Sequence, residues 1–146
     1  MKITNSIAAF IAIAAALAFT SCSNNHHKPD IIKINAELPV ELFIAAEMDD
    51  SVIALLPALM RENVHISELI HYQGDSVITV PFCFSDTGKY AQITEANLEK
   101  RIAISINGDI VSTPIVKMKI TNGACSVHLS KNQIAKLFPS TATDNF

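Results

Sequence analysis

The sequence lacks the motifs that mark most nucleotide-binding and hydrolytic enzymes. It contains no glycine-rich phosphate loop, no Gly-x-Ser-x-Gly turn around a nucleophile and no His-Glu-x-x-His zinc motif. Basic residues number 11 against 14 acidic ones, whereas proteins that bind nucleic acids concentrate positive charge. We therefore expect a protein that is not an enzyme, carries no cofactor and binds no nucleic acid.

No run after residue 22 is long enough to span a bilayer, but an apolar run from Ile7 to Phe19 follows Lys2 near the start of the chain. This length is short for a membrane span and typical of the core of a signal peptide. The run ends in Phe19-Thr20-Ser21-Cys22, which resembles a bacterial lipobox with Phe19 in place of the usual aliphatic residue. We expect residues 1–21 to be removed and Cys22 to be acylated; the alternatives are an uncleaved anchor and an ordinary signal peptide.

Residues 22–30 are polar, contain a proline and are predicted to form a flexible tether between the lipid and the fold. No acidic run follows Cys22, and in some bacterial lipoproteins such a run resembles a signal for export to the cell surface. Its absence favours a location facing the periplasm, with the outer membrane preferred over the inner one. Loss of Lys2 leaves 10 basic and 14 acidic residues, so the lipid, and not attraction to anionic headgroups, would hold the domain.

The five histidines do not form a recognisable metal site. His26 and His27 are adjacent in the tether, which lacks the fixed surroundings that hold metal ligands in place. The other three could meet in space but lack the paired spacing of metal ligands: His65, His71 and His128. We expect no bound metal.

Acidic and sulfur-bearing side chains also have structural explanations. Asp49-Asp50 and Asp109 could bring their carboxylates together as a pair. A helix cap explains the first two residues, however, and the flank of a hairpin explains Asp109. Cys83 and Cys125 would lie in a compartment that permits disulfides. A bridge requires their strands to be neighbours with matched faces, and this alternative stays open.

The first part of the folded region is predicted to contain two strands and a helix. Pro39 removes a ladder donor and should separate strands on either side of it, within residues 31–47. Asp49-Asp50-Ser51 can cap a helix over residues 52–60, which Pro57 would kink.

Two strands, Ile66–Tyr72 and Val77–Phe84, are predicted to follow on either side of Gln73-Gly74-Asp75. In the second strand, alternate apolar residues share the face that should be buried: Ile78, Val80, Phe82 and Phe84. Asp86 and Thr87 can then cap a helix that runs to about residue 98. Its buried face should hold Tyr90 and Ile93, and Thr94 could break it.

Two Asn-Gly pairs between alternating apolar runs predict two β-hairpins, because this dipeptide favours the type I′ turn. Around Asn107-Gly108 the expected pairs are Ile106 with Asp109, Ser105 with Ile110, Ile104 with Val111 and Ile102 with Thr113. Around Asn122-Gly123 they are Ile120 with Cys125, Met118 with Val127 and Val116 with Leu129. The second hairpin would then expose a polar face: Lys117, Lys119, Ser126 and His128.

The last helix should begin at Ser130, where Gln133 completes a capping box, and should end at Pro139. Residues 140–146 are predicted to form a frayed tail. We therefore predict an α+β fold for residues 31–139, a single antiparallel, hairpin-built sheet with two or three helices packed on one face.

The second half of the chain resembles a known family. The residues that carry the resemblance fall in the family's order and spacing: Asp86, Gly88, Thr94, Asn107, Gly108, Ser112, Pro114 and Gly123. Together with Phe84 and the strand Ile102-Ala103-Ile104, they resemble the head subdomain of the first periplasmic region of SecD, an accessory subunit of the bacterial protein translocon. The resemblance covers roughly Val77–Leu137, about half of the expected mature chain.

The sequence departs from this family in several places. Tyr90 stands where the family often has a small or basic residue, and Cys125-Ser126-Val127-His128 replaces a strand that contains glycine. The transmembrane helices and the base subdomain, with which SecD couples proton flow to motion, have no counterpart in the sequence. The resemblance therefore implies the α+β fold of the head and its contact with emerging polypeptide, and not the motor.

We expect a cell-envelope lipoprotein with a non-catalytic domain that binds a polypeptide or an envelope protein, in a setting linked to protein export. The predicted contact face is the polar side of the second hairpin, with Lys117, Lys119, Ser126 and His128. One alternative is an inhibitor or immunity lipoprotein that acts on an envelope hydrolase or toxin. Another is a small hydrolase or metal-binding enzyme that uses the histidines.

Overall fold

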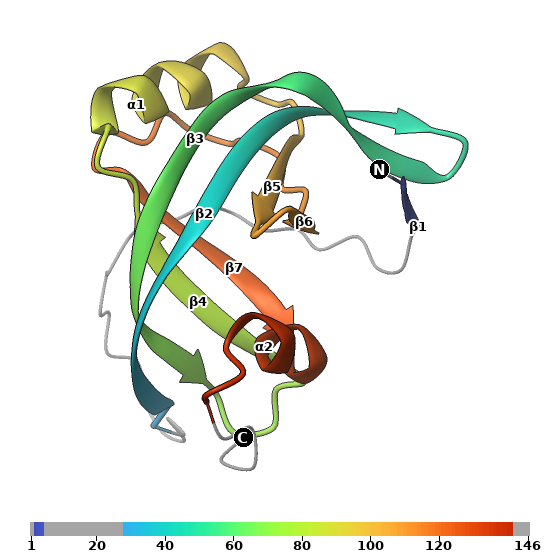
Figure 1. Ribbon diagram of the computed structural model, residues 1–146. Helices are drawn as coiled ribbons and strands as arrows, with labels where there is room; N and C mark the ends of the chain where they lie inside the picture. Colours follow the sequence, from blue (N-terminus) through green and yellow to red (C-terminus); the bar gives the residue numbers. More distant parts are fainter. Residues whose placement is uncertain (1, 5–27, 142–146) are drawn as a thin grey trace, which may run out of the picture.

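One long β-hairpin runs through the molecule. The computed structural model describes residues 2–4 and 28–141. Strand β2 (Asp30–Met48) and strand β3 (Ser51–His71) pair antiparallel and curve together across the molecule in Figure 1. Asp49 and Asp50 form the two-residue turn between them, with φ angles of 44° and 62°. Both angles lie in the left-handed region that a type I′ turn requires, and aspartate tolerates this region better than most residues.

The remaining strands extend the sheet from the two sides of this hairpin. They are β4 (Val77–Cys83), β5 (Ile102–Ile106), β6 (Asp109–Ser112) and β7 (Ala124–Ser130). Their order is β6-β5-β2-β3-β4-β7, and every neighbouring pair is antiparallel. A short strand, β1 (Lys2–Thr4), pairs with β3 beside the turn. Two helices complete the described chain, α1 (Thr87–Ala96) and α2 (Lys131–Leu137).

The predicted single antiparallel sheet is confirmed, but the prediction of an α+β fold with its helices on one face is not. The helices have 10 and 7 residues, whereas β2 and β3 have 19 and 21, so the fold is richer in sheet than expected. Figure 1 shows α1 and α2 at opposite ends of the curled sheet. α1 contacts β3, and α2 contacts β4 and β7.

The predicted break at Pro39 is wrong, because β2 continues through it. Pro39 is paired with Asn63 of β3 on one side, and on the other its carbonyl accepts a hydrogen bond from the amide of Asn107, 2.9 Å away. The amide and carbonyl of one strand residue point to the same side. The missing N–H of Pro39 therefore points past the end of β5, where no ladder partner would receive it.

The predicted helix over residues 52–60 is also wrong, since these residues lie in β3. Asp49 and Asp50 form the hairpin turn instead of capping a helix. Leu42 pairs with Met60 and Ile44 with Leu55, so the four residues between Leu55 and Met60 bulge out of the ladder and take up Pro57. Pairing with β2 decides the conformation of these residues, and a pattern within residues 52–60 cannot reveal that pairing.

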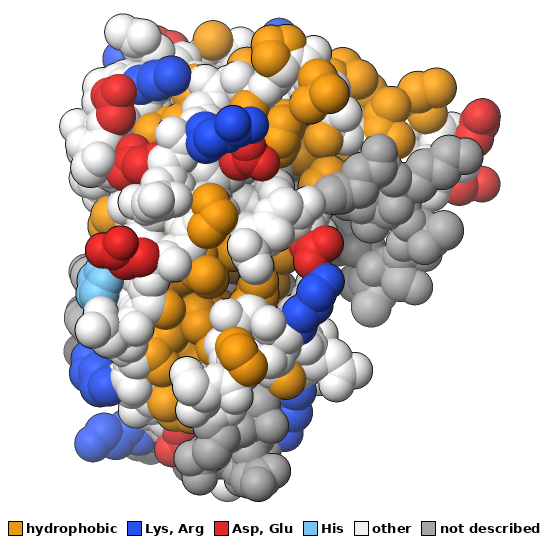
Figure 2. Space-filling view, viewed as in Figure 1, with side chains coloured by type: hydrophobic (Ala, Val, Ile, Leu, Met, Phe, Trp, Pro, Cys, Tyr) orange, Lys and Arg blue, Asp and Glu red, His pale blue; other side chains and the backbone are white. Residues whose placement is uncertain are grey.

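The end of the hairpin, residues 44–59, is called the hairpin tip below. It projects past β5 in Figure 1 and carries four exposed large apolar side chains: Ile44, Met48, Leu55 and Leu56. Leu56 is 84% exposed. Figure 2 shows hydrophobic side chains gathered over this end of the molecule, with acidic side chains at its extremity.

Residues 28–141 form a hydrophobic core. Its buried residues run from Val40 to Phe138, with partly buried Ile32 and Ile34 packed against them. The predicted inner face of β4 is confirmed, because Ile78, Val80, Phe82 and Phe84 are all buried. The chain that remains after the predicted cleavage therefore keeps the whole of the described core.

Local signals predicted both helices correctly. The Asp86 carboxylate accepts from the amide of Lys89 at 2.9 Å and caps α1, whose Tyr90 and Ile93 are buried. Ser130 and Gln133 form the predicted capping box of α2. Thr94 does not break α1: its hydroxyl accepts from the amide of Ile120, 3.0 Å away, and bonds to a carbonyl of the preceding turn.

The first predicted hairpin is confirmed near its turn. Asn107 and Gly108 have φ angles of 52° and 86°, and Ile106 pairs with Asp109, as expected. The register then shifts, because Ile104 pairs with Ser112 and not with Val111. All five residues of β5 are buried.

The second predicted hairpin is wrong. β7 pairs with β4 over seven residue pairs, from Val77 with Ser130 to Cys83 with Ala124. The segment before Gly123 forms no strand with it, and Met118, predicted to face inward, is 53% exposed. The inward alternation predicted for β7 nevertheless holds, since it depends on the strand itself and not on its partner: Cys125, Val127 and Leu129 are buried.

Gly123 is required for a different reason from the one expected. It has φ of 73°, and its carbonyl accepts from the amide of Phe84 at 2.9 Å. A Cβ atom at this position would lie 2.3 Å from the carbonyl oxygen of Phe84. The glycine therefore allows two main-chain segments to cross, and it does not form the tip of a type I′ turn.

Replacing Gly123 by Ala should destabilise the domain more than replacing Gly108 by Ala. Both residues have positive φ, so each substitution costs about 1–2 kcal/mol from backbone conformation. Only Gly123→Ala adds a clash, because nothing lies within 4 Å of a Cβ at Gly108, and overpacking adds about 1–3 kcal/mol. Urea unfolding of the two variants measures the difference; equal losses would contradict the close crossing.

A carboxylate on β3 holds the start of α1. Glu62 accepts from the amide of Ser85 at 2.6 Å and, at 3.4 Å, from that of Asp86. Burial alone would raise the pKa of Glu62, but hydrogen bonds from Ser85 and Asp86 outweigh it and lower the pKa below the ordinary value of 4.5 for this side chain. The ionised form is therefore the one that the fold stabilises.

The lowered pKa predicts how the stability contribution of Glu62 depends on pH. It should be fully present above about pH 4.5 and lost as the pH falls through the folded-state pKa, because the unfolded chain then binds the proton first. Wild type should exceed Glu62→Gln in free energy of unfolding at pH 7, and the gap should narrow steadily as the pH falls below 4.5. The exposed Glu37→Gln is the control; a gap that does not change with falling pH would refute the assignment.

Candidate functional site

The residues that carry the SecD resemblance have structural positions around α1 and β5. Asp86 caps α1, and Thr94 bonds α1 to the segment that leads to Gly123. The carbonyl of Pro114 accepts from the amide of Ile102 at 3.0 Å, and Ser112 ends β6. A Cβ at Gly88 would meet only the Asp86 carboxylate, 3.9 Å away, so packing does not demand glycine there.

The four residues predicted to form a contact face do not lie together on a hairpin. Lys117 pairs with Glu99 at 2.7 Å, and Lys119 pairs with Glu95 at 2.9 Å, which ties the segment before β7 to the end of α1. Ser126 and His128 lie on the outer side of β7. The predicted face is therefore divided between two structural elements.

The histidines occupy separate places in the described structure. His65 is exposed and faces Glu37 across the ladder, whereas His71 is buried and its Nε2 lies 3.0 Å from the carbonyl oxygen of Asp75. His128 Nδ1 lies 3.0 Å from the hydroxyl of Thr79. Within residues 2–4 and 28–141, no three His, Cys, Asp or Glu residues are grouped as metal ligands. His26, His27 and Cys22 lie outside the described residues.

Cys83 and Cys125 are free, which resolves the open alternative of a disulfide. Their strands are neighbours, but Phe82 is paired with Cys125 and Cys83 with Ala124. Successive residues of a strand point to opposite faces, so the two sulfurs lie on opposite sides of the sheet. Burial, the largest cause, raises the pKa of the Cys125 thiol to about 12, despite a hydrogen bond with Tyr90. Cys125 is therefore a core residue and not a reactive thiol.

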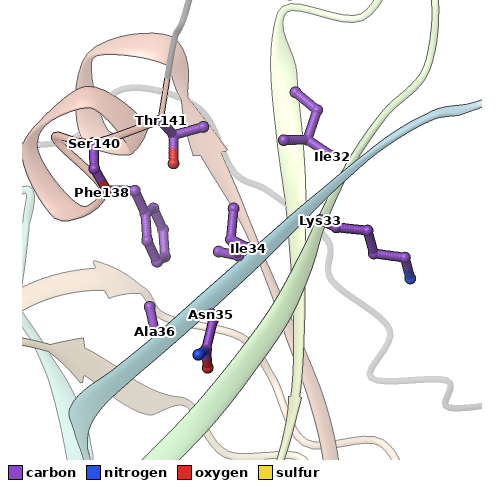
Figure 3. Close-up of a pocket in the computed structure, with 8 residues that line it drawn as sticks. All are labelled: Ile32, Lys33, Ile34, Asn35, Ala36, Phe138, Ser140 and Thr141. Carbon is purple, nitrogen blue, oxygen red and sulfur yellow. The ribbon is translucent and has the colours of Figure 1, made fainter.

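A pocket lies between the first half of β2 and the end of α2 (Figure 3). Its volume is about 320 Å³, and it is lined by Ile32, Lys33, Ile34, Asn35, Ala36, Phe138, Ser140 and Thr141. Figure 3 shows Ile34 and Ala36 on the side of β2 that faces Phe138, whereas Lys33 points away. Lys33 instead pairs with Glu68. The pocket lining thus combines apolar side chains from β2 and Phe138 with polar groups such as Asn35 and Thr141.

The edge of β2 beside this pocket has no partner strand among the described residues. β5 pairs only with residues 40–44 of β2, so residues 30–38 are paired with β3 alone. A bulge interrupts that ladder, because Lys33 is opposite Glu68 and Ala36 is opposite Ile66. Ile34 and Asn35 together oppose one residue of β3. We call this unpaired edge, together with the pocket, the β2 groove.

The β2 groove can accept a strand but offers little for bond-breaking chemistry. Its main-chain amides and carbonyls can bond to an extended peptide, and its apolar lining can take side chains from that peptide. The side chains that line it include no carboxylate, histidine or thiol. Sequence reasoning missed it because Ile34 and Phe138 are about a hundred residues apart. The alternation of Ile32, Ile34, Ala36 and Leu38 was the one local sign of an inner face.

Neither α1 nor α2, the two helices of the described residues, is long and apolar enough to cross a membrane. The sequence matches no family model and no curated protein. A similar chain is found in a solved structure. Its title is "Structure and function of a membrane component SecDF that enhances protein export".

The similarity to that chain is partial. It has 16% sequence identity and a TM-score of 0.45, and it covers 62% of this chain and 55% of that chain. The match therefore spans little more than half of that protein's chain. SecDF is also the protein that the residues of this sequence resemble.

Proposed function

We propose that this chain is a cell-envelope lipoprotein, held at the membrane through Cys22, whose domain binds extended polypeptide segments without turnover. The β2 groove is the observation that carries the proposal. The sequence resemblance to the SecD head favours polypeptides in export as the ligands. The order of charge, apolar core and cysteine at the N-terminus favours the anchor and a position facing the periplasm.

The main chain of β2 would supply most of the affinity. Residues 30–38 offer a free edge about 30 Å long at the rise of a strand. A segment added to this edge bonds through its own amides and carbonyls, which every polypeptide has. Recognition should therefore be tolerant of sequence, and affinity should be modest because the ligand loses conformational freedom on binding.

The pocket would supply the limited selectivity. Side chains of an added strand alternate, so every second residue would point toward Ile34, Ala36 and Phe138. A volume of about 320 Å³ admits one or two aliphatic or aromatic side chains. The residues between them would face solvent on the side of Lys33. The preferred ligand is thus an unfolded segment with alternating apolar residues.

Binding can be tested with the acyl-free mature chain, residues 22–146 with Cys22→Ser, titrated with unfolded envelope proteins. We expect binding in the micromolar range, with amide protection that increases in residues 30–38. Ile34→Lys places a charge beside Phe138 and should weaken binding about tenfold, since it removes apolar contact and adds a buried charge.

Met118→Lys is the control, because it adds the same charge at an apolar residue that is 53% exposed and lies outside the β2 groove. Thermal melts should show that both variants fold. No binding at high micromolar concentration, or protection that leaves residues 30–38 unchanged, would overturn the proposal and favour an inhibitor of an envelope enzyme instead.

The anchor has its own test. Cys22→Ala should abolish incorporation of labelled palmitate in a bacterial host and release the protein from membranes, because the acyl chain is attached to this sulfur. Cys83→Ala should keep both label and membrane association. Labelling that persists in Cys22→Ala would show that the lipid, if any, is attached elsewhere.

A further inference from the structure

The hairpin tip has a second strand edge, at the opposite end of the long hairpin from the start of β2 (Figure 1). Ser51 pairs with Met48 across a two-residue turn, so these two residues exchange main-chain hydrogen bonds. The next residue, Val52, then directs its amide and carbonyl away from β2. Main-chain groups at this edge of β3 are therefore available to another strand.

β1 occupies this edge. Lys2 pairs with Ile53, Ile3 with Val52 and Thr4 with Ser51, in antiparallel register. β1 comes from the segment that we predict to be removed before Cys22. Cleavage would therefore take away the strand that covers the edge, while the core of residues 28–141 stays in the chain.

The surroundings of the edge indicate what could replace β1. The tip exposes apolar side chains, with Leu55 and Leu56 on β3 and Met48 beside the turn. Its charged residues are acidic: Asp49 and Asp50 are exposed, and Glu47 pairs with Arg101 at 2.8 Å. This combination suits a basic and apolar segment and disfavours an anionic membrane surface. A partner segment is also favoured because the tip lies at the opposite end of the hairpin from Asp30, the first residue of β2.

We propose that the β3 edge at the hairpin tip is a strand-docking site for an extended segment of a partner protein that combines a Lys or Arg with β-branched residues. In the unprocessed chain, Lys2–Thr4 occupy the site, and removal of residues 1–21 opens it. The proposal rests on the proposed processing at Cys22, but its site and its ligand are distinct from those of the β2 groove. The mature protein would thus hold two extended segments, one at each end of the hairpin.

The test uses the mature chain, residues 22–146 with Cys22→Ser and Cys83→Ser, and a peptide of residues 1–6 that carries Thr4→Cys. Ser51→Cys in the protein should form a disulfide with this peptide, since Thr4 and Ser51 are directly opposed in a pair without mutual hydrogen bonds, where side chains are closest. Ile53→Cys, two residues along the same face, is the register control and should react about tenfold more slowly.

A second peptide, N-methylated at Ile3, keeps every side chain but loses the amide that bonds to Val52. It should crosslink about tenfold less efficiently, because one main-chain hydrogen bond is lost. Equal rates for Ser51→Cys and Ile53→Cys, or no effect of N-methylation, would overturn strand docking. Disulfide-linked dimers of Ser51→Cys that exclude the peptide would show that a second copy of the chain is the occupant, against the proposal.

The groove variant separates the two proposals. Ile34→Lys should leave crosslinking at Ser51→Cys unchanged, because residue 34 pairs near the other end of the hairpin. Absence of polypeptide binding by the mature chain that keeps Ile34, with intact docking at the tip, would contradict only the proposed function. The converse result would contradict only this inference.

Discussion

The antiparallel pairing of β2 with β3 is the interaction on which the rest of the structure depends. Each strand uses one edge for this ladder and the other for additional elements: β5 joins β2, and β4 joins β3. The pairing is much longer than the strands that it receives, since β5 has 5 residues and β4 has 7. Among the described residues, β2 has no partner strand on the outer edge of residues 30–38, and at the tip only the short strand β1 pairs with the outer edge of β3. Unpaired main-chain amides and carbonyls at a sheet edge commonly bind extended peptides, and they also allow sheets to aggregate.

The tertiary core reinforces the central part of this hairpin, where Val40, Leu42, Met60 and Val64 are buried. The core also extends behind the free edge of β2, because Ile66 and Leu69 of β3 are buried opposite it. A strand added to that edge would therefore join a supported part of the sheet. The two candidate surfaces lie on either side of the central part. Glu62 and Gly123 act between them, where they fix α1 and the start of β7 against the sheet.

Sequence reasoning succeeded where the signal was local. The Asp86 cap, the Ser130 capping box and the alternation of β4 each depend on residues within one element. It failed where a distant strand decided the outcome. Asn122-Gly123 has the composition of a hairpin turn, but seven pairs with β4 and a main-chain crossing at Phe84 outweigh that preference. Residues 52–60 likewise have capping and helical features, yet pairing with β2 makes them a strand. The β2 groove was not predictable, because Phe138 comes from α2 and the free edge is defined by where β5 ends.

The Asp49-Asp50 turn also orders events during folding. It joins strands that are adjacent in sequence, so closing the central hairpin requires little loop entropy, whereas β7 must return to β4 from about fifty residues away. In a chain that crosses a membrane from its N-terminus, the hairpin can close while β7 has yet to emerge. During that interval the outer edge of β4 lacks the strand with which it makes seven residue pairs. The last strand to arrive therefore closes this edge of the sheet.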